Sequence, residues 1–247
     1  MSQSPPAPHA IVDAEKLAAL KELAYGASHE INNPLANIAA RAQTLLRDEV
    51  DPERRRALEA IHLQSLRAHE MISDLMLFAR PPQLQLAPVD PAVVVRQVVA
   101  QFRQPCHERG LQLSLDAPAA CPTVQADANQ LAEAVRALVL NAVEAVGVDG
   151  RVAVSVRAAR STDPSDAAVA VEIADNGRGL TDREAEHAFD PFFSGREAGR
   201  GLGFGLAKCW RIVTAHGGNV QLQSGDKAGA VATLTLPVGA THDLASE

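Results

Sequence analysis

The chain of 247 residues is 47% hydrophobic, 21% charged and 3% aromatic, and its formal net charge is −7 at pH 7. This hydrophobic fraction is ordinary for a globular protein and excludes a wholly disordered chain, and the acidic balance argues against a nucleic-acid-binding protein. No apolar run approaches the ~18 residues that a membrane-spanning helix needs, and the N-terminus lacks the layout of a signal peptide. The three cysteines form no CxxC pair, so we expect reduced thiols in a soluble, cytoplasmic protein without direct membrane insertion.

Shifts in composition divide the chain into segments that we expect to differ in structure. Residues 1–12 are rich in Ser, Pro and Ala and predict a flexible tail. Residues 13–80 hold almost no glycine and predict two long helices. Residues 81–89 contain repeated prolines and predict a semi-rigid linker, because proline cannot continue a helix. Residues 90–240 alternate between helical and strand-like patterns, and residues 241–247 form a second tail.

The first of these helical patterns carries apolar residues in steps of three and four from Leu17 to Leu45, which form one stripe. A second stripe runs from Leu58 to Leu75, and Asp51-Pro52 between the stripes provides an N-cap and a first helical residue. The short connection makes the two helices antiparallel neighbours. A lone hairpin roughly 50 Å long, at 1.5 Å per residue, buries such stripes poorly. Two copies packed as a four-helix bundle bury them, so we predict a homodimer.

The segment 90–240 predicts an α/β sandwich of about 150 residues, which is large enough for its own core. Helices are expected from Asp90-Pro91 to Arg109, from Asn129 to Val146 after the cap Asp127, and from Phe204 to His216. Strands are expected at 111–115, 151–156, 168–173, 220–223 and 231–236. The predicted fold class is therefore α+β, a two-helix hairpin followed by an α/β sandwich.

One histidine lies on the polar face of the first predicted helix. His29 is about 200° around the helix from the apolar stripe and therefore faces solvent. Glu30 follows directly, Asn33 stands one turn on, and Pro34 deletes the backbone bond to the Glu30 carbonyl at a cost of ~3 kcal/mol. A neutral imidazole is a nucleophile at one nitrogen when a neighbouring carboxylate takes the proton from the other. The HExxH pattern of a zinc protease is excluded, because Asn33 stands where the second histidine is needed.

Residues 27–35 (Ala-Ser-His-Glu-Ile-Asn-Asn-Pro-Leu) resemble the phosphoacceptor box of two-component sensor histidine kinases. The closest subgroup is that of the nitrogen-regulation kinases, whose box reads HExxNPL. The resemblance implies that His29 is the phosphorylated residue and that Glu30 is the general base. It also implies that Asn33 positions groups, including the water used when such enzymes dephosphorylate their partner. The pair His69-Glu70 lacks the following Asn and Pro, and we interpret it as a solvated surface.

Four clusters in the second segment combine glycines with polar or aromatic residues. Asn141 borders the apolar stripe of its helix, where a half-buried amide needs a partner. Residues 175–180 (Asp-Asn-Gly-Arg-Gly-Leu) end a strand, where glycines let the backbone approach a flat ligand closely and the aspartate can accept from an exocyclic amine. Residues 189–196 contain three phenylalanines and end in Arg196, which can reach a phosphate. Residues 199–206 alternate glycine with other residues and open a helix, whose N-terminal amides attract phosphate.

Each cluster alone also fits a structural role, but in this order the four resemble the N, G1, F and G2 boxes of the histidine-kinase ATP-binding domain. That domain has the Bergerat-type fold shared with gyrase, Hsp90 and MutL, and with the hairpin the resemblance spans about residues 13–237. It implies that Asn141 binds Mg²⁺, that Asp175 binds the adenine amine, and that a lid extends over about residues 181–200. The further residues that it places around the nucleotide are Gly177, Gly179, Arg196, Gly201, Gly203 and Gly205.

Two departures from the family pattern bear on the chemistry. Ala137 stands where the family often has a second Asn and where gyrase-like ATPases hold the glutamate that activates water. This weakens the case for an ATPase and for strong Mg²⁺ coordination. Ser194-Gly195-Arg196 replaces the Thr-Thr-Lys common after the F box, and keeps a cation with a planar, bidentate head.

The sequence therefore predicts an ATP-dependent protein-histidine kinase that autophosphorylates His29 and passes the phosphoryl group to an aspartate of a separate response regulator. We expect the sensor to lie in a partner or in a longer protein, since only about a dozen residues precede the first helix. One alternative is a response-regulator phosphatase or scaffold with weak kinase activity, which Asn33 permits. Another is an ATP-gated dimeric clamp that hydrolyses nucleotide, against which Ala137 and the phosphoacceptor box both argue.

Overall fold

In a computed structural model of the chain, the described residues are 14–159, 167–193, 203–225 and 228–239, with side chains described from Glu30 onward. The chain divides into two compact units. One unit contains the helical segment up to Pro82, grouped with the short stretch 191–204, and the other contains most of the remaining chain. Within the described part of the chain, no helix has the length and hydropathy needed to cross a bilayer.

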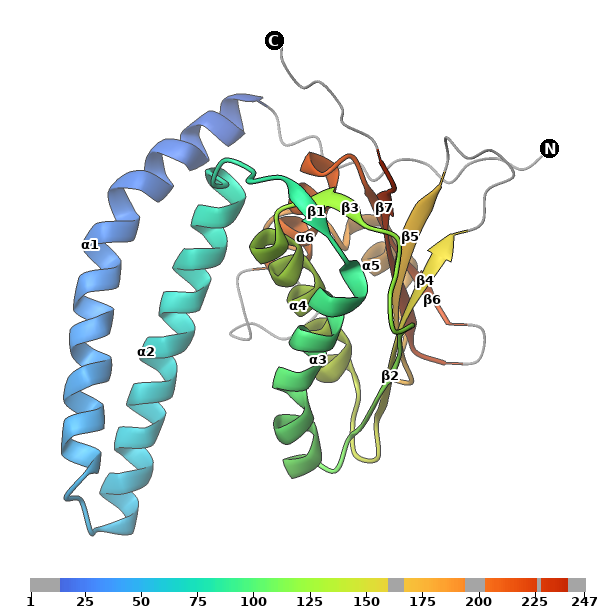
Figure 1. The fold of residues 1–247 in the computed structure, drawn as a ribbon. Coiled ribbons are helices and arrows are strands. Elements are labelled where there is room, and N and C mark those ends of the chain that lie inside the picture. The colour runs from blue at the N-terminus through green and yellow to red at the C-terminus, as the bar shows by residue number, and fades with distance from the viewer. Residues whose placement is uncertain (1–13, 160–166, 194–202, 226–227, 240–247) are drawn as a thin grey trace. The chain divides into compact units, whose positions relative to one another are not determined.

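The helical segment is a hairpin of α1 (Ala14–Leu46) and α2 (Pro52–Ala79), drawn in blue to cyan in Figure 1. Asp51 caps α2, because its Oδ1 accepts from the backbone N–H groups of Glu53 at 3.0 Å and Arg54 at 2.9 Å. This confirms the N-cap and the helix start predicted at Asp51-Pro52. The helix α1 continues through Pro34, although proline leaves the carbonyl one turn earlier without its helical donor.

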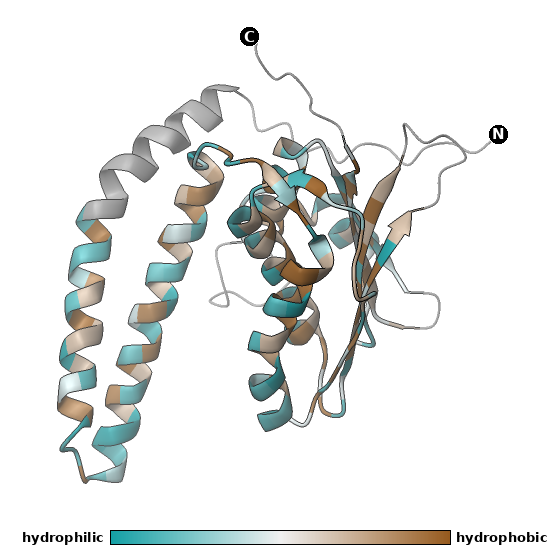
Figure 2. Ribbon diagram, in the orientation of Figure 1, coloured by the Kyte–Doolittle hydropathy of each residue, from teal (hydrophilic) through white to brown (hydrophobic). Residues whose placement is uncertain are grey.

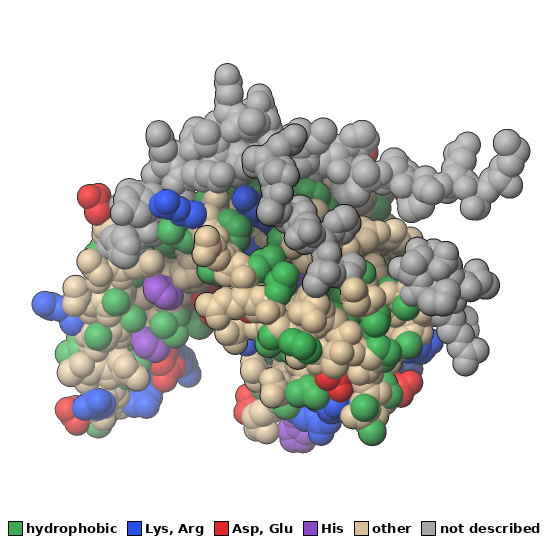
Figure 3. Space-filling model, turned by 45° about the horizontal axis from the view of Figure 1, so that its top comes forward, with side chains coloured by type: hydrophobic (Ala, Val, Ile, Leu, Met, Phe, Trp, Pro, Cys, Tyr) green, Lys and Arg blue, Asp and Glu red, His purple; other side chains and the backbone are tan. Residues whose placement is uncertain are grey.

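Hydrophobic and hydrophilic residues alternate along α2 and along the coloured part of α1 (Figure 2). Of the apolar side chains described from Glu30 onward in these helices, only a few are buried, among them Ala39 and Ala42, which are 9% and 3% exposed. Six of the larger apolar side chains described in these helices are between 39% and 60% exposed: Ile31, Ile38, Leu45, Ile61, Leu63 and Leu66. In Figure 3 such side chains (green) lie at the surface of the hairpin beside charged and histidine side chains.

The second unit is built on a five-stranded sheet in the order β2-β4-β5-β7-β6. Its strands are β2 (Gln112–Asp116), β4 (Arg151–Ala159), β5 (Ala168–Asp175), β6 (Asn219–Ser224) and β7 (Ala230–Pro237). The pair β2–β4 is parallel, and the three other pairs are antiparallel, with Val171 of β5 opposite Leu234 of β7. All five strands lie where the sequence predicts them, with small shifts at their ends.

Three helices cover one face of this sheet (Figure 1): α3 (Pro91–Glu108), α4 (Ala128–Ala145) and α6 (Gly205–Ala215). Inward-facing strand residues such as Val154, Ile173 and Leu234 are at most 1% exposed and form the core beneath the helices. The predicted caps are confirmed: Asp90 and Asp127 accept from backbone N–H groups at the starts of α3 and α4.

Three short elements were not predicted from the sequence. The strands β1 (Ala87–Val89) and β3 (Val124–Ala126) pair antiparallel, so that a strand lies inside the segment 81–89 that the prolines predict to be a linker. Just before β1, the backbone N–H of Gln85 donates to Asp127 Oδ2 at 3.1 Å. A six-residue helix, α5 (Asp182–His187), begins inside the segment predicted as a lid.

Candidate functional site

The turn that follows β5 is organised around the carboxylate of Asp175. Its Oδ1 accepts from the backbone N–H of Gly177 at 2.8 Å and from that of Ala230 at 3.3 Å. Burial raises the pKa of this carboxyl, and the two backbone donors only partly offset the increase. The next side chain, Asn176, accepts from the Arg151 N–H at 2.6 Å and ties the turn to the start of β4.

Three glycines allow the backbone to close around Asp175. A Cβ on Gly177 would lie 2.5 Å from the Ala145 carbonyl oxygen of α4, and a Cβ on Gly229 would overlap the Asp175 carbonyl. Gly179 and Gly229 also have positive φ angles of +76° and +79°, which favour glycine. The sequence predicted Gly177 and Gly179 as site residues and missed Gly229, because its closeness to Asp175 arises only from the pairing of β5 with β7.

Asp175 and the glycines Gly177, Gly179 and Gly229 together form what we call the glycine cradle. The question is whether these residues fit a nucleotide. A half-buried carboxylate stands at a strand end among glycines whose missing side chains leave backbone atoms close to one another. Such an arrangement suits a flat ring that presents an exocyclic amine to the carboxylate. The fit therefore agrees with the role that the sequence implies for Asp175.

The helix α4 brings the predicted Asn141 to the same end of the sheet, since its last residue, Ala145, is the one that Gly177 approaches. Asn141 is half-buried, and its amide oxygen is a suitable ligand for Mg²⁺. One turn earlier Ala137 is buried and offers no side-chain oxygen. A further turn back, Glu133 forms an ion pair of 3.5 Å with Lys208 of α6. The face of α4 that carries Asn141 is thus joined to the helix that begins at Gly205.

Phenylalanines link the third and fourth predicted clusters. Phe192 meets Phe204 edge to face, with ring centroids 4.7 Å apart and an interplanar angle of 66°. Gly203 has a φ of +74°, and a Cβ there would lie 2.8 Å from the Phe192 carbonyl carbon. Two of the predicted nucleotide residues, Arg196 and Gly201, lie outside the described residues, as do residues 194–200 of the predicted lid.

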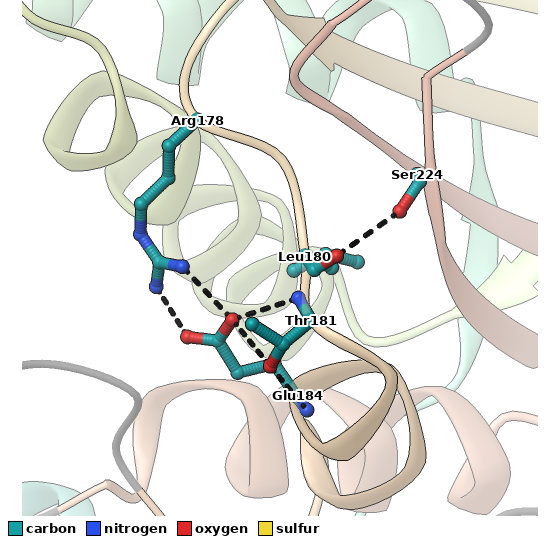
Figure 4. A network of polar contacts seen from close by, with 5 residues as sticks. All are labelled: Arg178, Leu180, Thr181, Glu184 and Ser224. Atoms are coloured by element: carbon teal, nitrogen blue, oxygen red, sulfur yellow. Dashed lines mark hydrogen bonds and ion pairs between the residues drawn. The ribbon is translucent and has the colours of Figure 1, made fainter.

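A polar network that was not predicted fixes the loop between the Asp175 turn and α5 (Figure 4). Arg178 forms a bidentate ion pair with Glu184, in which Nη1 donates to Oε2 at 2.9 Å. Glu184 also accepts from the N–H and the hydroxyl of Thr181, both at 2.9 Å, and completes a capping box at the start of α5. The hydrogen bond from Arg178, together with those from Thr181, lowers the pKa of Glu184 to about 2. The Thr-x-x-Glu spacing was a readable signal for this helix start.

The predicted phosphoacceptor residues lie on α1. His29 is within the helix, but its side chain is not among the described ones. The side chains of Glu30 and Asn33 are exposed, as solvent-facing groups should be. Between them, Asn32 is half-buried, and its Oδ1 lies 3.0 Å from Nδ1 of His69 on α2. His69 is exposed, in agreement with the predicted solvated surface, but it also joins the two helices, which the sequence did not predict.

Comparison with known families agrees with this arrangement. Residues 19–83 match the His Kinase A (phospho-acceptor) domain. Residues 126–240 match the family of histidine kinase-, DNA gyrase B-, and HSP90-like ATPases. The chain is therefore the core of a two-component histidine kinase, with a phosphoacceptor hairpin followed by an ATPase-type domain.

Among individual proteins, the chain is similar to the sensor histidine kinase ZraS of Klebsiella oxytoca, with 35% identity over 225 residues that make up 91% of this chain and 47% of the relative. The chain spans about half the length of the curated relatives it matches. The expected nearness to the nitrogen-regulation kinases stays a prediction.

Two solved structures show the same fold. Full-length ShkA in complex with AMPPNP matches with a TM-score of 0.70 and 27% identity over 92% of this chain and 46% of that one. The histidine kinase ThkA, solved in complex with the response regulator TrrA, matches with a TM-score of 0.65 and 21% identity over 91% of this chain and 64% of that one. These likenesses confirm the predicted helical hairpin followed by an α/β domain.

Proposed function

We propose that the chain is an ATP-dependent protein-histidine kinase that autophosphorylates His29 and passes the phosphoryl group to an aspartate of a response regulator. The single observation that carries this proposal is the glycine cradle around the half-buried Asp175, on a chain that also holds the His29 box. A nucleotide site without a phosphoacceptor fits many ATPases, and a histidine box without a nucleotide site cannot phosphorylate itself.

The nucleotide is assigned to the Asp175 end of the sheet. Asp175 accepts a hydrogen bond from the adenine amine, and Gly177 and Gly179 let the backbone lie against the ring. Asn141 holds the Mg²⁺ that accompanies ATP, whose charge offsets that of the phosphates. The amides at the start of α6 favour phosphate. We assign the phosphates to Gly203 and Gly205 together with Arg196 and Gly201.

The phosphoryl group moves in two steps. In the first, a ring nitrogen of His29 bonds to the γ-phosphorus of ATP while the bond from that phosphorus to the bridging oxygen breaks and ADP leaves. Glu30 takes the proton from the other ring nitrogen, as an adjacent carboxylate can. In the second step, the nitrogen–phosphorus bond breaks as a carboxylate oxygen of the regulator bonds to phosphorus. Asn33, exposed one turn beyond His29, suits the positioning of a water that would hydrolyse the aspartyl phosphate of the regulator, giving the free carboxylate and inorganic phosphate.

We further propose that two copies form a homodimer through their hairpins. The hairpin has an open groove of ≈ 370 Å³ lined by Leu35, Ala60, Ile61, Gln64 and Ser65, and several apolar side chains of α1 and α2 are half-exposed. A second hairpin would cover these side chains in a four-helix bundle. In this assignment residues 13–80 are the dimerisation and phosphotransfer domain, and residues 90–240 bind ATP. Because the reaction needs ATP and a receiver protein, we place both domains in the cytoplasm, with the sensor input supplied from outside these residues.

Incubation with γ-labelled ATP and Mg²⁺ tests the proposal. Wild type should acquire a label that is acid-labile and alkali-stable, and His29→Gln should acquire none while still binding nucleotide. Asp175→Asn should lose label because it loses nucleotide. Label that survives in His29→Gln would contradict the assignment of the acceptor. Wild type that binds nucleotide without becoming labelled would favour the phosphatase or scaffold alternative.

A further inference from the structure

Two histidines of α2 reach across the hairpin to α1. His62 Nδ1 lies 3.1 Å from the Ala39 carbonyl oxygen, and His69 Nδ1 lies 3.0 Å from Asn32 Oδ1. The two contacts are about two turns apart on both helices. They differ in their partners, since His62 meets a backbone atom and His69 meets a side chain.

The contact of His69 falls on the turn of α1 that holds the phosphoacceptor. Asn32 follows His29 by three residues, and residues three apart are neighbours on a helix surface. The contact of His62 with Ala39, by comparison, lies well beyond this turn. Of the two cross-helix histidines, only His69 therefore acts next to the residue that receives the phosphoryl group.

This turn of α1 is also where the helix is weakened. Pro34 removes the backbone donor to the Glu30 carbonyl, so one hydrogen bond of the helix is absent between His29 and the following turn. An asparagine inside a helix also competes for local backbone groups. With its side-chain oxygen accepting from His69, Asn32 is instead held in one orientation by the neighbouring helix. Because an amide oxygen can only accept, Nδ1 of His69 is the donor in this contact.

We infer, on the basis of the proposed kinase function, that His69 is a positioning residue which holds the phosphoacceptor turn through Asn32. In this role it acts through Asn32 and not by contact with the reacting nitrogen or ATP. It fixes the backbone turn from which His29 and Glu30 project. Loss of the contact lets this turn move, which lowers the rate of phosphoryl transfer because small displacements of reacting groups are costly.

The test measures the rate of His29 labelling against ATP concentration, on the full chain. His69→Ala and Asn32→Ala should each lower kcat by roughly tenfold and leave KM for ATP unchanged, because neither residue is among those proposed to bind ATP. The double variant should be no slower than either single variant, since both remove the same contact. His69→Gln, whose amide N–H can still donate to Asn32, should recover most of the rate.

His62→Ala is the matched control, because it removes an imidazole contact between the same two helices. It should lower the unfolding temperature about as much as His69→Ala and leave kcat unchanged. Equal losses of kcat in both variants would mean that the effect is one of hairpin stability and would overturn the inference. So would an unchanged kcat in His69→Ala, or no recovery in His69→Gln when that variant is folded. Unlabelled wild type, by contrast, would contradict the proposed kinase function itself.

Discussion

The two units of this chain bury their apolar side chains to very different extents. In the sheet unit, Val154, Ile173 and Leu234 are at most 1% exposed, and the helices α3, α4 and α6 close one face of the sheet. In the hairpin, Ile38 and Ile61 keep 44% and 48% of their surface exposed. The sheet unit completes its own core and can hold a rigid site, whereas the hairpin depends on a further surface. The proposed nucleotide site needs the first property, and the proposed phosphoacceptor, which would have to meet a response regulator, uses the second.

The largest expected effect comes from filling the cradle of the rigid unit. In Gly229→Ala the new Cβ would overlap the Asp175 carbonyl at a φ of +79°, so we expect a loss of at least ~3 kcal/mol in the free energy of unfolding. Denaturant titration measures this loss, with Gly147→Ala, where a Cβ meets open space, as the control. Equal stability of the two variants would show that the turn is pliable. The sheet unit would then not be the rigid one of the two units.

The second prediction separates the site from the fold. Asp175→Asn keeps an oxygen for the Gly177 and Ala230 donors but loses the charge offered to the adenine amine. Nucleotide affinity should fall by about 1.5–3 kcal/mol, or roughly 10- to 100-fold, with stability little changed. Titration with a fluorescent nucleotide measures the affinity, and Asp182→Asn, at the exposed start of α5, is the control. Unchanged affinity would mean that adenine binds elsewhere.

A third prediction concerns the incomplete surface of the hairpin. Ile38→Ala removes a half-exposed apolar side chain from both copies, and we expect the dimer to weaken by about 2 kcal/mol. Sedimentation equilibrium over a range of protein concentrations gives the dissociation constant. Val93→Ala is the matched control, because Val93 of α3 is 43% exposed against 44% for Ile38. A monomer in both proteins, or equal effects of the two changes, would argue against a dimer formed by the hairpins.

The smallest effect tests the network at the edge of the nucleotide cradle. The pKa of Glu184 is lowered to about 2 by Arg178, so its stabilisation is fully present above pH ~4.5 and is lost as the pH falls toward 2. Glu184→Gln should cost about 1.5 kcal/mol at pH 7, because Arg178 is partly solvated. The difference from wild type should shrink when unfolding is measured at pH 3. Glu172→Gln, on the exposed face of β5, is the control that removes a carboxylate outside this ion pair.

What could be predicted from the sequence depended on local signals. The caps at Asp51, Asp90 and Asp127 and the periodic strands are patterns within a few residues, and the structure has them. The strands β1 and β3 have three residues each, too few for a period to stand out. Gly229 belongs to the site only because two distant strands pair. The contact of His69 with Asn32 depends on the register of two helices, which the sequence does not state.

The hydrogen bond from the Gln85 N–H to Asp127 also sets the length of the tether that follows the hairpin and leads into the sheet domain. The helix α2 ends at Ala79 and the chain is anchored again at Gln85, so only residues 80–84 remain to span the gap, at no more than about 3.5 Å each. Two of these residues are prolines, which stiffen the tether further. A tether this short keeps the local concentration of each unit around the other high. Inserting flexible residues after Pro82 would lower that local concentration and slow any encounter within one chain. The rate of encounters between chains would still depend on the protein concentration.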